Sequence, residues 1–191
     1  MIELRTPRLH IIAATPEIAR AEVEDRAALA ALLGAGLPSD WPPPLNDGAS
    51  ARFFLSYLTR HPEAVGWLIW YFILGDGTEA VAIGNGGFKG KPVDGAVEIG
   101  YSVIPRYQAR GLASEAVGAL VDWAFSHEGV RRVVAQTLPE SNASQALLHK
   151  IGFVETTPAE PGLLRFHLNI ARSGCSPRVA RRGRGSRGGF R

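Results

Sequence analysis

The order of apolar and polar positions along the chain predicts strands and helices in one mixed α/β domain. Apolar runs rich in β-branched and aromatic residues predict strands at 9–13, 67–74, 80–88, 97–103, 132–138, from 153 onward, and 163–169. A helical period predicts helices over 15–33 with a break near Asp25, and over 50–60, 113–124 and 143–151. We therefore expect a mixed central sheet of about six to seven strands with helices on both faces.

The helix expected over residues 50–60 has an amphipathic pattern. Its apolar residues predict an inward face formed by Phe53, Phe54, Tyr57 and Leu58. A proline-rich stretch over residues 37–48 precedes it and predicts a loop.

Length and composition fit one globular domain, because the chain has 191 residues of which 46% are hydrophobic. Its longest apolar run, residues 65–74, is about half of the roughly 20 residues that a membrane-spanning helix needs. Residues 1–8 carry no secretory signal pattern, and Cys175 is the single cysteine. We expect a cytoplasmic protein with no membrane contact, no disulfide within the chain and no metal site.

The charge is divided unevenly between the body of the chain and its end. Residues 172–191 hold seven arginines and no acid, so removing them turns the net charge of +3 into −4. This Arg/Gly-rich segment has too little apolar surface to offset the entropy of ordering it. We predict a folded domain over residues 1–171 and a disordered basic tail over 172–191. The tail either attracts nucleic acid or is a solvated, dispensable extension.

Candidate chemistry lies where the strand at 97–103 leads through a basic turn into a helix. Arg110 and Gly111 precede this helix, in place of a capping Ser, Thr, Asp or Asn. A helix start carries unpaired N–H groups and a partial positive charge, and glycine lets a ligand approach the backbone. The pattern predicts an anion site.

Two blocks in this order resemble the GCN5-related N-acetyltransferase (GNAT) family. The run Gln108-x-x-Gly111-x-Ala113 resembles the family's acyl-CoA motif, Q/R-x-x-G-x-G/A. The flanking residues 98–101 and the block at 143–153 resemble the branch of ribosomal-protein N-terminal acetyltransferases (RimJ/RimL-like). The resemblance covers residues 5–170 and is strongest between 96 and 153.

The resemblance implies a GNAT fold in which the parallel strands at 97–103 and 132–138 splay apart to admit acetyl-CoA as co-substrate. It implies that the backbone of Val103 pairs with the pantetheine arm and that Asn142 and Ser144 lie near it. The motif residues expected to bind the cofactor, mainly through amides around the pyrophosphate, are Gln108, Ala109, Arg110, Gly111, Leu112, Ala113 and Ser114.

Acetyl transfer to an amine needs a proton acceptor, a partner for the developing oxyanion and a thiolate that can leave. Alternation leaves Glu98 as the ionisable side chain on the polar face of the splayed strand, so it is the candidate base. The alternative is that Glu98 pairs structurally with an arginine or contacts the acceptor. The N–H of Val103 is the expected oxyanion donor.

Ser144 is the candidate acid for the leaving thiol. Many relatives use a tyrosine on the later helix, where this chain has Leu148. The asparagine of the branch's N-x-A-S pattern is displaced by one position to Asn142, with Ser141 in its place. Capping of the helix or a plain hydrogen bond to the cofactor is the alternative role for Ser144.

Trp41, in the proline-rich loop, is the candidate substrate-binding residue, with simple packing as the alternative. The expected acceptor is a small-molecule or peptide amine, and the net charge of −4 favours a cationic one. The competing classes are a non-catalytic acyl-CoA-binding module and a protein that the tail brings to nucleic acid. The family's members are often monomers or dimers, and we expect one of these states.

Overall fold

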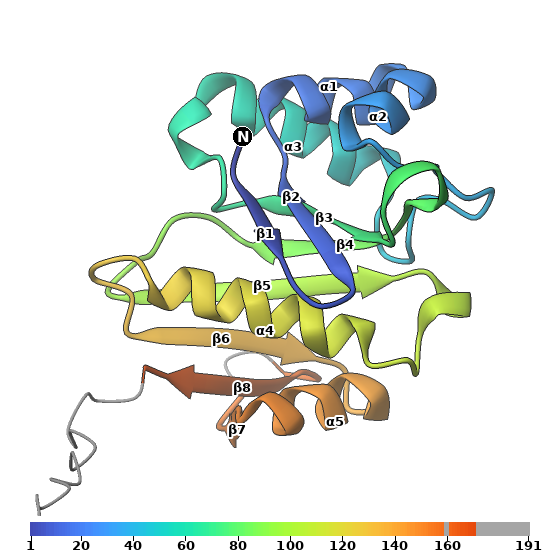
Figure 1. Ribbon diagram of the computed structural model, residues 1–191. Coiled ribbons are helices and arrows are strands. Elements are labelled where there is room, and N and C mark those ends of the chain that lie inside the picture. Colours follow the sequence, from blue (N-terminus) through green and yellow to red (C-terminus); the bar gives the residue numbers. More distant parts are fainter. Residues whose placement is uncertain (159–160, 171–191) are drawn as a thin grey trace, which may run out of the picture.

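One mixed sheet organises the computed structural model, which describes residues 1–158 and 161–170 (Figure 1). Its strands follow the order β1-β2-β3-β4-β5-β6-β8-β7. Neighbours are antiparallel except β5 and β6, which are parallel. The strands are β1 (Glu3–Arg5), β2 (Leu9–Ala13), β3 (Ile69–Leu74), β4 (Val81–Phe88), β5 (Ala96–Val103), β6 (Arg132–Thr137), β7 (Val154–Thr156) and β8 (Leu164–Asn169).

The mixed sheet is confirmed, but its eight strands exceed the six to seven expected. The additional strand is β1, which pairs with β2 from Glu3↔Ile12 to Arg5↔His10. This strand has three residues with one apolar side chain, the partly buried Leu4, which is too short a pattern to predict a strand from the sequence.

The predicted helices form, and Asp25 divides the first of them. The helices are α1 (Pro16–Glu24), α2 (Arg26–Leu33), α3 (Gly48–Arg60), α4 (Leu112–Phe125) and α5 (Asn142–Ile151), with short 3-10 turns at 62–64, 77–79 and 105–107. Asp25 closes α1 by donating its N–H to the carbonyl of Ala21. Its carboxylate then accepts from the amides of Ala27 and Ala28, which caps the start of α2.

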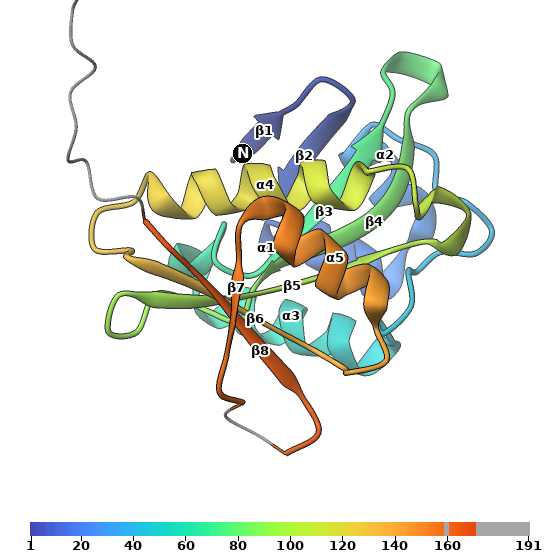
Figure 2. The same ribbon diagram turned by 90° about the horizontal axis from the view of Figure 1, so that it is seen from below.

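Two hydrophobic cores lie on opposite faces of the sheet. Helices α4 and α5 cover one face, and α1–α3 cover the other (Figures 1 and 2). Ile11 and Phe72 belong to the core beneath α4 and α5, whereas Ile12 and Tyr71 belong to the core beneath α1–α3. The alternation of side chains along each strand sends neighbours to opposite faces.

The inward face expected for α3 is wrong at Phe53. Leu58 is fully buried and Phe54 and Tyr57 are partly buried, but Phe53 is 55% exposed. Five residues separate Phe53 from Leu58, which places them about 140° apart around the helix. Phe53 instead lies over the rings of Phe54 and Tyr57.

The two parallel strands diverge part-way along their length, as expected for the splay. Pairs between β5 and β6 run from Ala96↔Arg132 to Ile99↔Ala135. Beyond that point β5 stays paired with β4 as far as Val103, and β6 stays paired with β8 as far as Thr137. A wedge therefore opens between residues 100–103 and 136–137.

The predicted basic tail at 172–191 lies outside the described residues. Across 1–158 and 161–170, no helix combines the length and the apolar character needed to cross a bilayer.

Candidate active site

The turn between β5 and α4 presents backbone amides toward the wedge. Ala109 and Gly111 both have positive φ, 56° and 74°, which the tight turn requires. Gly111 occupies the N-cap position, and no side chain of the described residues caps the helix there. The first amides of α4 therefore remain available to an anion, as the sequence predicted.

The wedge also has a directed amide at its open end, where β5 finishes. Ile104 donates its N–H to Ile83 on β4, and neighbouring strand residues direct their N–H groups to opposite edges. The N–H of Val103 consequently faces the gap toward β6. The side-chain amide of Gln108 donates to the carbonyl of Val103 at 2.7 Å, which ties the turn to the end of the strand.

Glu115, in the first turn of α4, anchors this turn to the N-terminal hairpin. One carboxylate oxygen accepts from the hydroxyl of Thr6 at 2.6 Å and the amide of Arg8 at 2.9 Å. The other accepts from the Arg8 guanidinium at 2.7 and 2.6 Å, and the same guanidinium donates to the carbonyl of Arg110. Burial alone would raise the pKa of Glu115, but these bonds outweigh it and lower the pKa.

A groove of about 490 Å³ runs along the turn and the wedge. We call it the splay groove. It is lined by seven of the predicted site residues: Val103, Gln108, Ala109, Gly111, Ala113, Ser114 and Ser144. Six of these come from β5, the turn and α4, and Ser144 comes from α5, so two distant parts of the chain meet there.

Three of the residues predicted to bind the cofactor, Arg110, Leu112 and Asn142, do not line the splay groove. Arg110 has its guanidinium 5.8 Å from the ring centre of Tyr107. Leu112 is buried in the core beneath α4. Asn142 is exposed at the start of α5, while Ser141 lines the groove in its place. Their roles stay predictions.

Tyr101, Ser141 and Ser144 form a hydroxyl cluster where the strands part. The hydroxyl of Ser141 donates to that of Ser144 at 3.0 Å. The buried hydroxyl of Tyr101 lies beside Ser144 and has no hydrogen-bond partner of good geometry within the described residues. Burial raises the pKa of Tyr101, with Ser144 acting weakly against it, so the phenol keeps its proton.

A second pocket of about 520 Å³, the central pocket, shares Tyr101, Ser102 and Ser144 with the splay groove. Glu98 lies beside it. The carboxylate of Glu98 forms an ion pair with Lys89 and accepts from the amide of Gln136 at 3.1 Å. The structural pairing considered for Glu98 thus exists, with a lysine rather than an arginine as partner.

Comparison with known proteins identifies the family. The family model described as "Acetyltransferase (GNAT) domain" matches residues 16–154. The chain is 31% identical over 157 residues to the N-acetyltransferase YjdG of Bacillus subtilis, covering 81% of this chain and 90% of that protein. This chain belongs to the GNAT acetyltransferase family.

Solved structures share the GNAT fold. One is the ribosomal L7/L12 α-N-protein acetyltransferase RimL in complex with coenzyme A, with 20% identity, TM-score 0.60 and coverage of 88% of this chain and 98% of that one. Another is the ribosomal-protein-S5-alanine acetyltransferase from Vibrio fischeri, with 21% identity, TM-score 0.57 and coverage of 88% and 97%. The resemblance to the GNAT family is thereby confirmed, and these structures show that the fold is shared. As a member of the GNAT family, the chain is an acetyl-CoA-dependent N-acetyltransferase.

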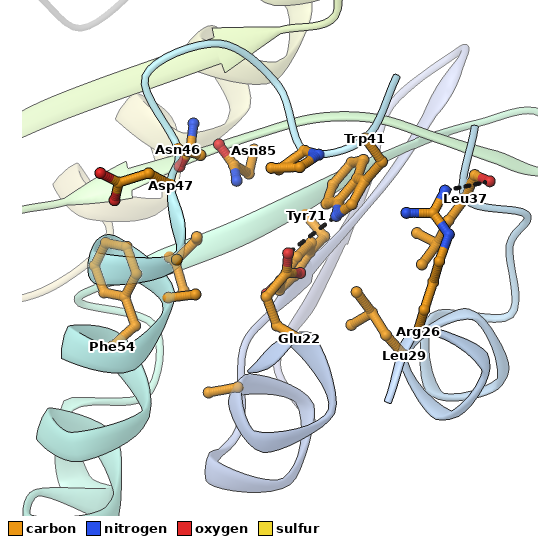
Figure 3. A pocket seen from close by; sticks show the side chains of 15 residues that line it. Glu22, Arg26, Leu29, Leu37, Trp41, Asn46, Asp47, Phe54, Tyr71 and Asn85 are labelled. Atoms are coloured by element: carbon orange, nitrogen blue, oxygen red, sulfur yellow. Dashed lines mark hydrogen bonds between the residues drawn. The ribbon is translucent and has the colours of Figure 1, made fainter. Parts of the chain in front are cut away.

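Trp41 does not touch the splay groove of this GNAT enzyme. Its side chain is 8% exposed, stacks on Tyr71 with ring centres 6.0 Å apart, and donates its Nε1 hydrogen to Glu22 at 3.0 Å. It lines a third pocket of about 230 Å³, the inner pocket, beneath α1 and the proline-rich loop (Figure 3). Trp41 is therefore packed in the core and also lines a pocket, and its role in binding the substrate stays a prediction.

Tyr101, Glu22 and Asn85 were not among the predicted site residues, yet each contributes a polar group to a pocket. A signal existed for Glu22, because it lies four residues after the buried Ile18 and three after the buried Ala19. A carboxylate on the apolar stripe of a helix indicates a buried charge. Tyr101 lies on the apolar side of β5, and only the splay opens that side to the cleft.

Proposed function

We propose that the enzyme transfers the acetyl group from acetyl-CoA directly to a primary amine while both are bound. The acceptor is a protein N-terminal amine or a small-molecule amine. The observation that carries the proposal is the continuity of the splay groove with the central pocket through Tyr101, Ser102 and Ser144. A donor in the groove and an acceptor in the pocket would meet at these residues.

The splay groove suits acetyl-CoA. Positive-φ residues and the uncapped start of α4 offer amides to the pyrophosphate. Residues 100–103 and 136–137 leave an unpaired strand edge of the kind that extended amide-containing ligands pair with. The thioester would supply an activated acetyl group where this groove meets the central pocket.

The transfer step forms one bond and breaks one. The neutral amine attacks the thioester carbonyl carbon, so a C–N bond forms and the oxygen becomes an oxyanion beside the N–H of Val103. The C–S bond then breaks, the sulfur leaves with the bonding pair, and the amide is released. A direct transfer needs no covalent acyl-enzyme.

Two side chains handle the protons. Glu98 accepts the proton that the acceptor ammonium loses, through a water molecule, and Lys89 and Gln136 hold the carboxylate in place. Ser144 donates its proton to the departing thiolate and takes up the second proton that the attacking nitrogen loses as the amide forms. The hydroxyl of Ser144 accepts a hydrogen bond from Ser141, so its own hydrogen is free to point toward the sulfur. The protonated hydroxyl of Tyr101 lies beside Ser144.

Calorimetric titration of acetyl-CoA tests the donor site. The Gly111→Glu variant places an anion and a side chain at the turn, so we expect micromolar binding by the wild type and none by the variant. Gly129→Glu is the matched control, because Gly129 also has positive φ and open space but lies outside the groove. Equal binding by all three proteins would refute the donor site. Thiol release with a panel of amines then distinguishes an enzyme from an acyl-CoA-binding module.

The pH dependence of turnover tests the proton assignments. We expect Glu98→Gln to lower kcat about a hundredfold, because the base is lost. Ser144→Ala should lower kcat with little change in the KM for the acceptor. Unchanged turnover of Glu98→Gln across the pH range would restrict that residue to its pairing with Lys89.

A further inference from the structure

The inner pocket is a largely apolar slot with two carboxylates, Glu22 and Asp47, in its lining. Its lining includes Leu29, Phe54 and Ile69 together with the stacked rings of Trp41 and Tyr71. Glu22 projects from α1 toward these two rings (Figure 3). The slot thus combines apolar surface for a carbon chain with a carboxylate beside two aromatic side chains.

Only one of the two carboxylate oxygens of Glu22 has a hydrogen-bond partner of good geometry among the described residues. One carboxylate oxygen accepts from Trp41 Nε1 at 3.0 Å, whereas the buried Oε2 has no hydrogen-bond partner of good geometry among the described residues. Burial raises the pKa of Glu22, against the lowering influence of Trp41, Tyr71 and Arg26. A buried carboxylate oxygen without a donor is costly, so the site gains most from a ligand that brings one.

The other charged side chains of the pocket are already engaged. Arg26 points away from Glu22 and donates to the carbonyls of Leu37 and Pro38 (Figure 3). Asp47 caps α3 by accepting from the amide and hydroxyl of Ser50. Glu22 is therefore the charged group that is left for a ligand in this lining.

The inner pocket communicates with the transfer point. It shares Asn46, Phe54, Ile69 and Asn85 with the central pocket. Asn85 is a buried polar side chain on β4, and its register partners are Tyr71 on one side and Ser102 on the other. A chain that leaves Ser102 along this face of the sheet passes Asn85 and reaches Tyr71 and Glu22.

We propose that the inner pocket selects acceptors that carry a second cationic group, separated from the reacting amine by a short aliphatic chain, and that Glu22 binds this cation. The proposal rests on the acetyl transfer proposed above. A cation supplies the donor that Oε2 lacks in a charge-assisted hydrogen bond, and the aromatic walls favour positive charge. The net charge of −4 over residues 1–171 attracts the same class of molecule.

Calorimetry on the CoA-saturated protein tests the site without requiring turnover. The probes are cadaverine and putrescine, each compared with the monoamine of equal length, and a lysine-containing dipeptide compared with its norleucine counterpart. We expect the cation-bearing member of at least one pair to bind about tenfold more tightly or better. The pair that shows the preference distinguishes a free diamine from a peptide side chain as the source of the cation.

Two variants assign the preference to its residue. Glu22→Gln keeps an oxygen for Trp41 but loses the charge, so it should abolish the preference. Glu24→Gln removes the same charge from an exposed position on α1 and should preserve it. Acetyl-CoA binding by both variants serves as the folding control.

The two proposals can fail separately. Equal binding within every probe pair, no binding of any probe, or a preference that persists in Glu22→Gln would overturn the role of the inner pocket. Binding that depends on Glu22, without thiol release from acetyl-CoA with any of these amines, would instead overturn the transfer reaction.

Discussion

Two carboxylates on opposite sides of the sheet, Glu115 and Glu22, differ in how many hydrogen bonds they accept. Glu115, on the donor side, receives four hydrogen-bonding groups from Thr6 and Arg8 within 2.9 Å. Glu22, on the acceptor side, receives one from Trp41 and has a buried oxygen left over. The pKa of Glu115 is lowered by its partners, while burial raises the pKa of Glu22.

The contrast separates a structural charge from a charge that awaits a ligand. A carboxylate that accepts hydrogen bonds from several donors of its own chain has no free oxygen for a small molecule. Here Glu115 holds the hairpin at residues 3–13 against the turn between β5 and α4. A carboxylate held by a single donor in an apolar pocket reduces stability until a ligand completes it. For these two carboxylates, the number of hydrogen bonds that each accepts separates a structural role from a ligand-binding role better than charge or position does.

Glu115→Gln gives the largest expected change in stability. The variant places an amide NH₂ where donors from Thr6 and Arg8 converge, so we expect a loss of about 2 kcal/mol in the free energy of unfolding at neutral pH. Urea denaturation measures it, with Asp122→Asn as the control, since Asp122 is exposed on the same helix. We also expect weaker acetyl-CoA binding, because Arg8 supports Arg110.

The loss should depend on pH with a definite sign. The pKa of Glu115 is lower in the folded state than its ordinary value of 4.5, so its contribution is present above that value. It disappears as the pH falls through the folded-state pKa. The difference between wild type and Glu115→Gln should therefore shrink in acid, and a constant difference would contradict the assignment.

Glu22→Gln gives a smaller change of the opposite sign. The folded-state pKa of Glu22 is raised, so ionisation of this group lowers stability as the pH rises from about 4.5 through the folded-state pKa. The neutral variant escapes this penalty and should be more stable than the wild type at neutral pH. Its advantage should vanish in acid, as urea denaturation at two pH values would show. A variant less stable than the wild type at neutral pH would mean that Oε2 of Glu22 has a donor within the protein.

Much of the fold follows from local patterns in the sequence. The helical break at Asp25 was predictable because one side chain can end one helix and cap the next. The order of strands and helices follows from hydrophobic periodicity over segments of five residues or more. β1 and the outward position of Phe53 did not follow, since a three-residue strand has no period and several aromatic residues on one helix cannot all face inward.

The turn at residues 108–114 was easier to predict from the sequence than the inner pocket. The residues that form the acyl-CoA turn are contiguous, so a motif from 108 to 114 describes most of it. The inner pocket joins Glu22, Trp41, Tyr71 and Asn85 from four separate segments. Its character depends on which donors reach Glu22 in the folded chain, and no spacing in the sequence encodes that. The ion pair of Glu98 with Lys89 likewise arises from a β-hairpin pairing rather than from a motif.

The separation of the two hydrophobic cores has a consequence for how such an enzyme can be altered. The wall of the inner pocket rests largely on the core beneath α1–α3, and the acyl-CoA turn rests on the core beneath α4 and α5. Substitutions that reshape residues 16–58 thus act mainly on one layer of packing, while the layer beneath α4 and α5 keeps most of its own contacts. With the acceptor bound as proposed, acceptor preference is then open to redesign without repacking the core beside the splay groove.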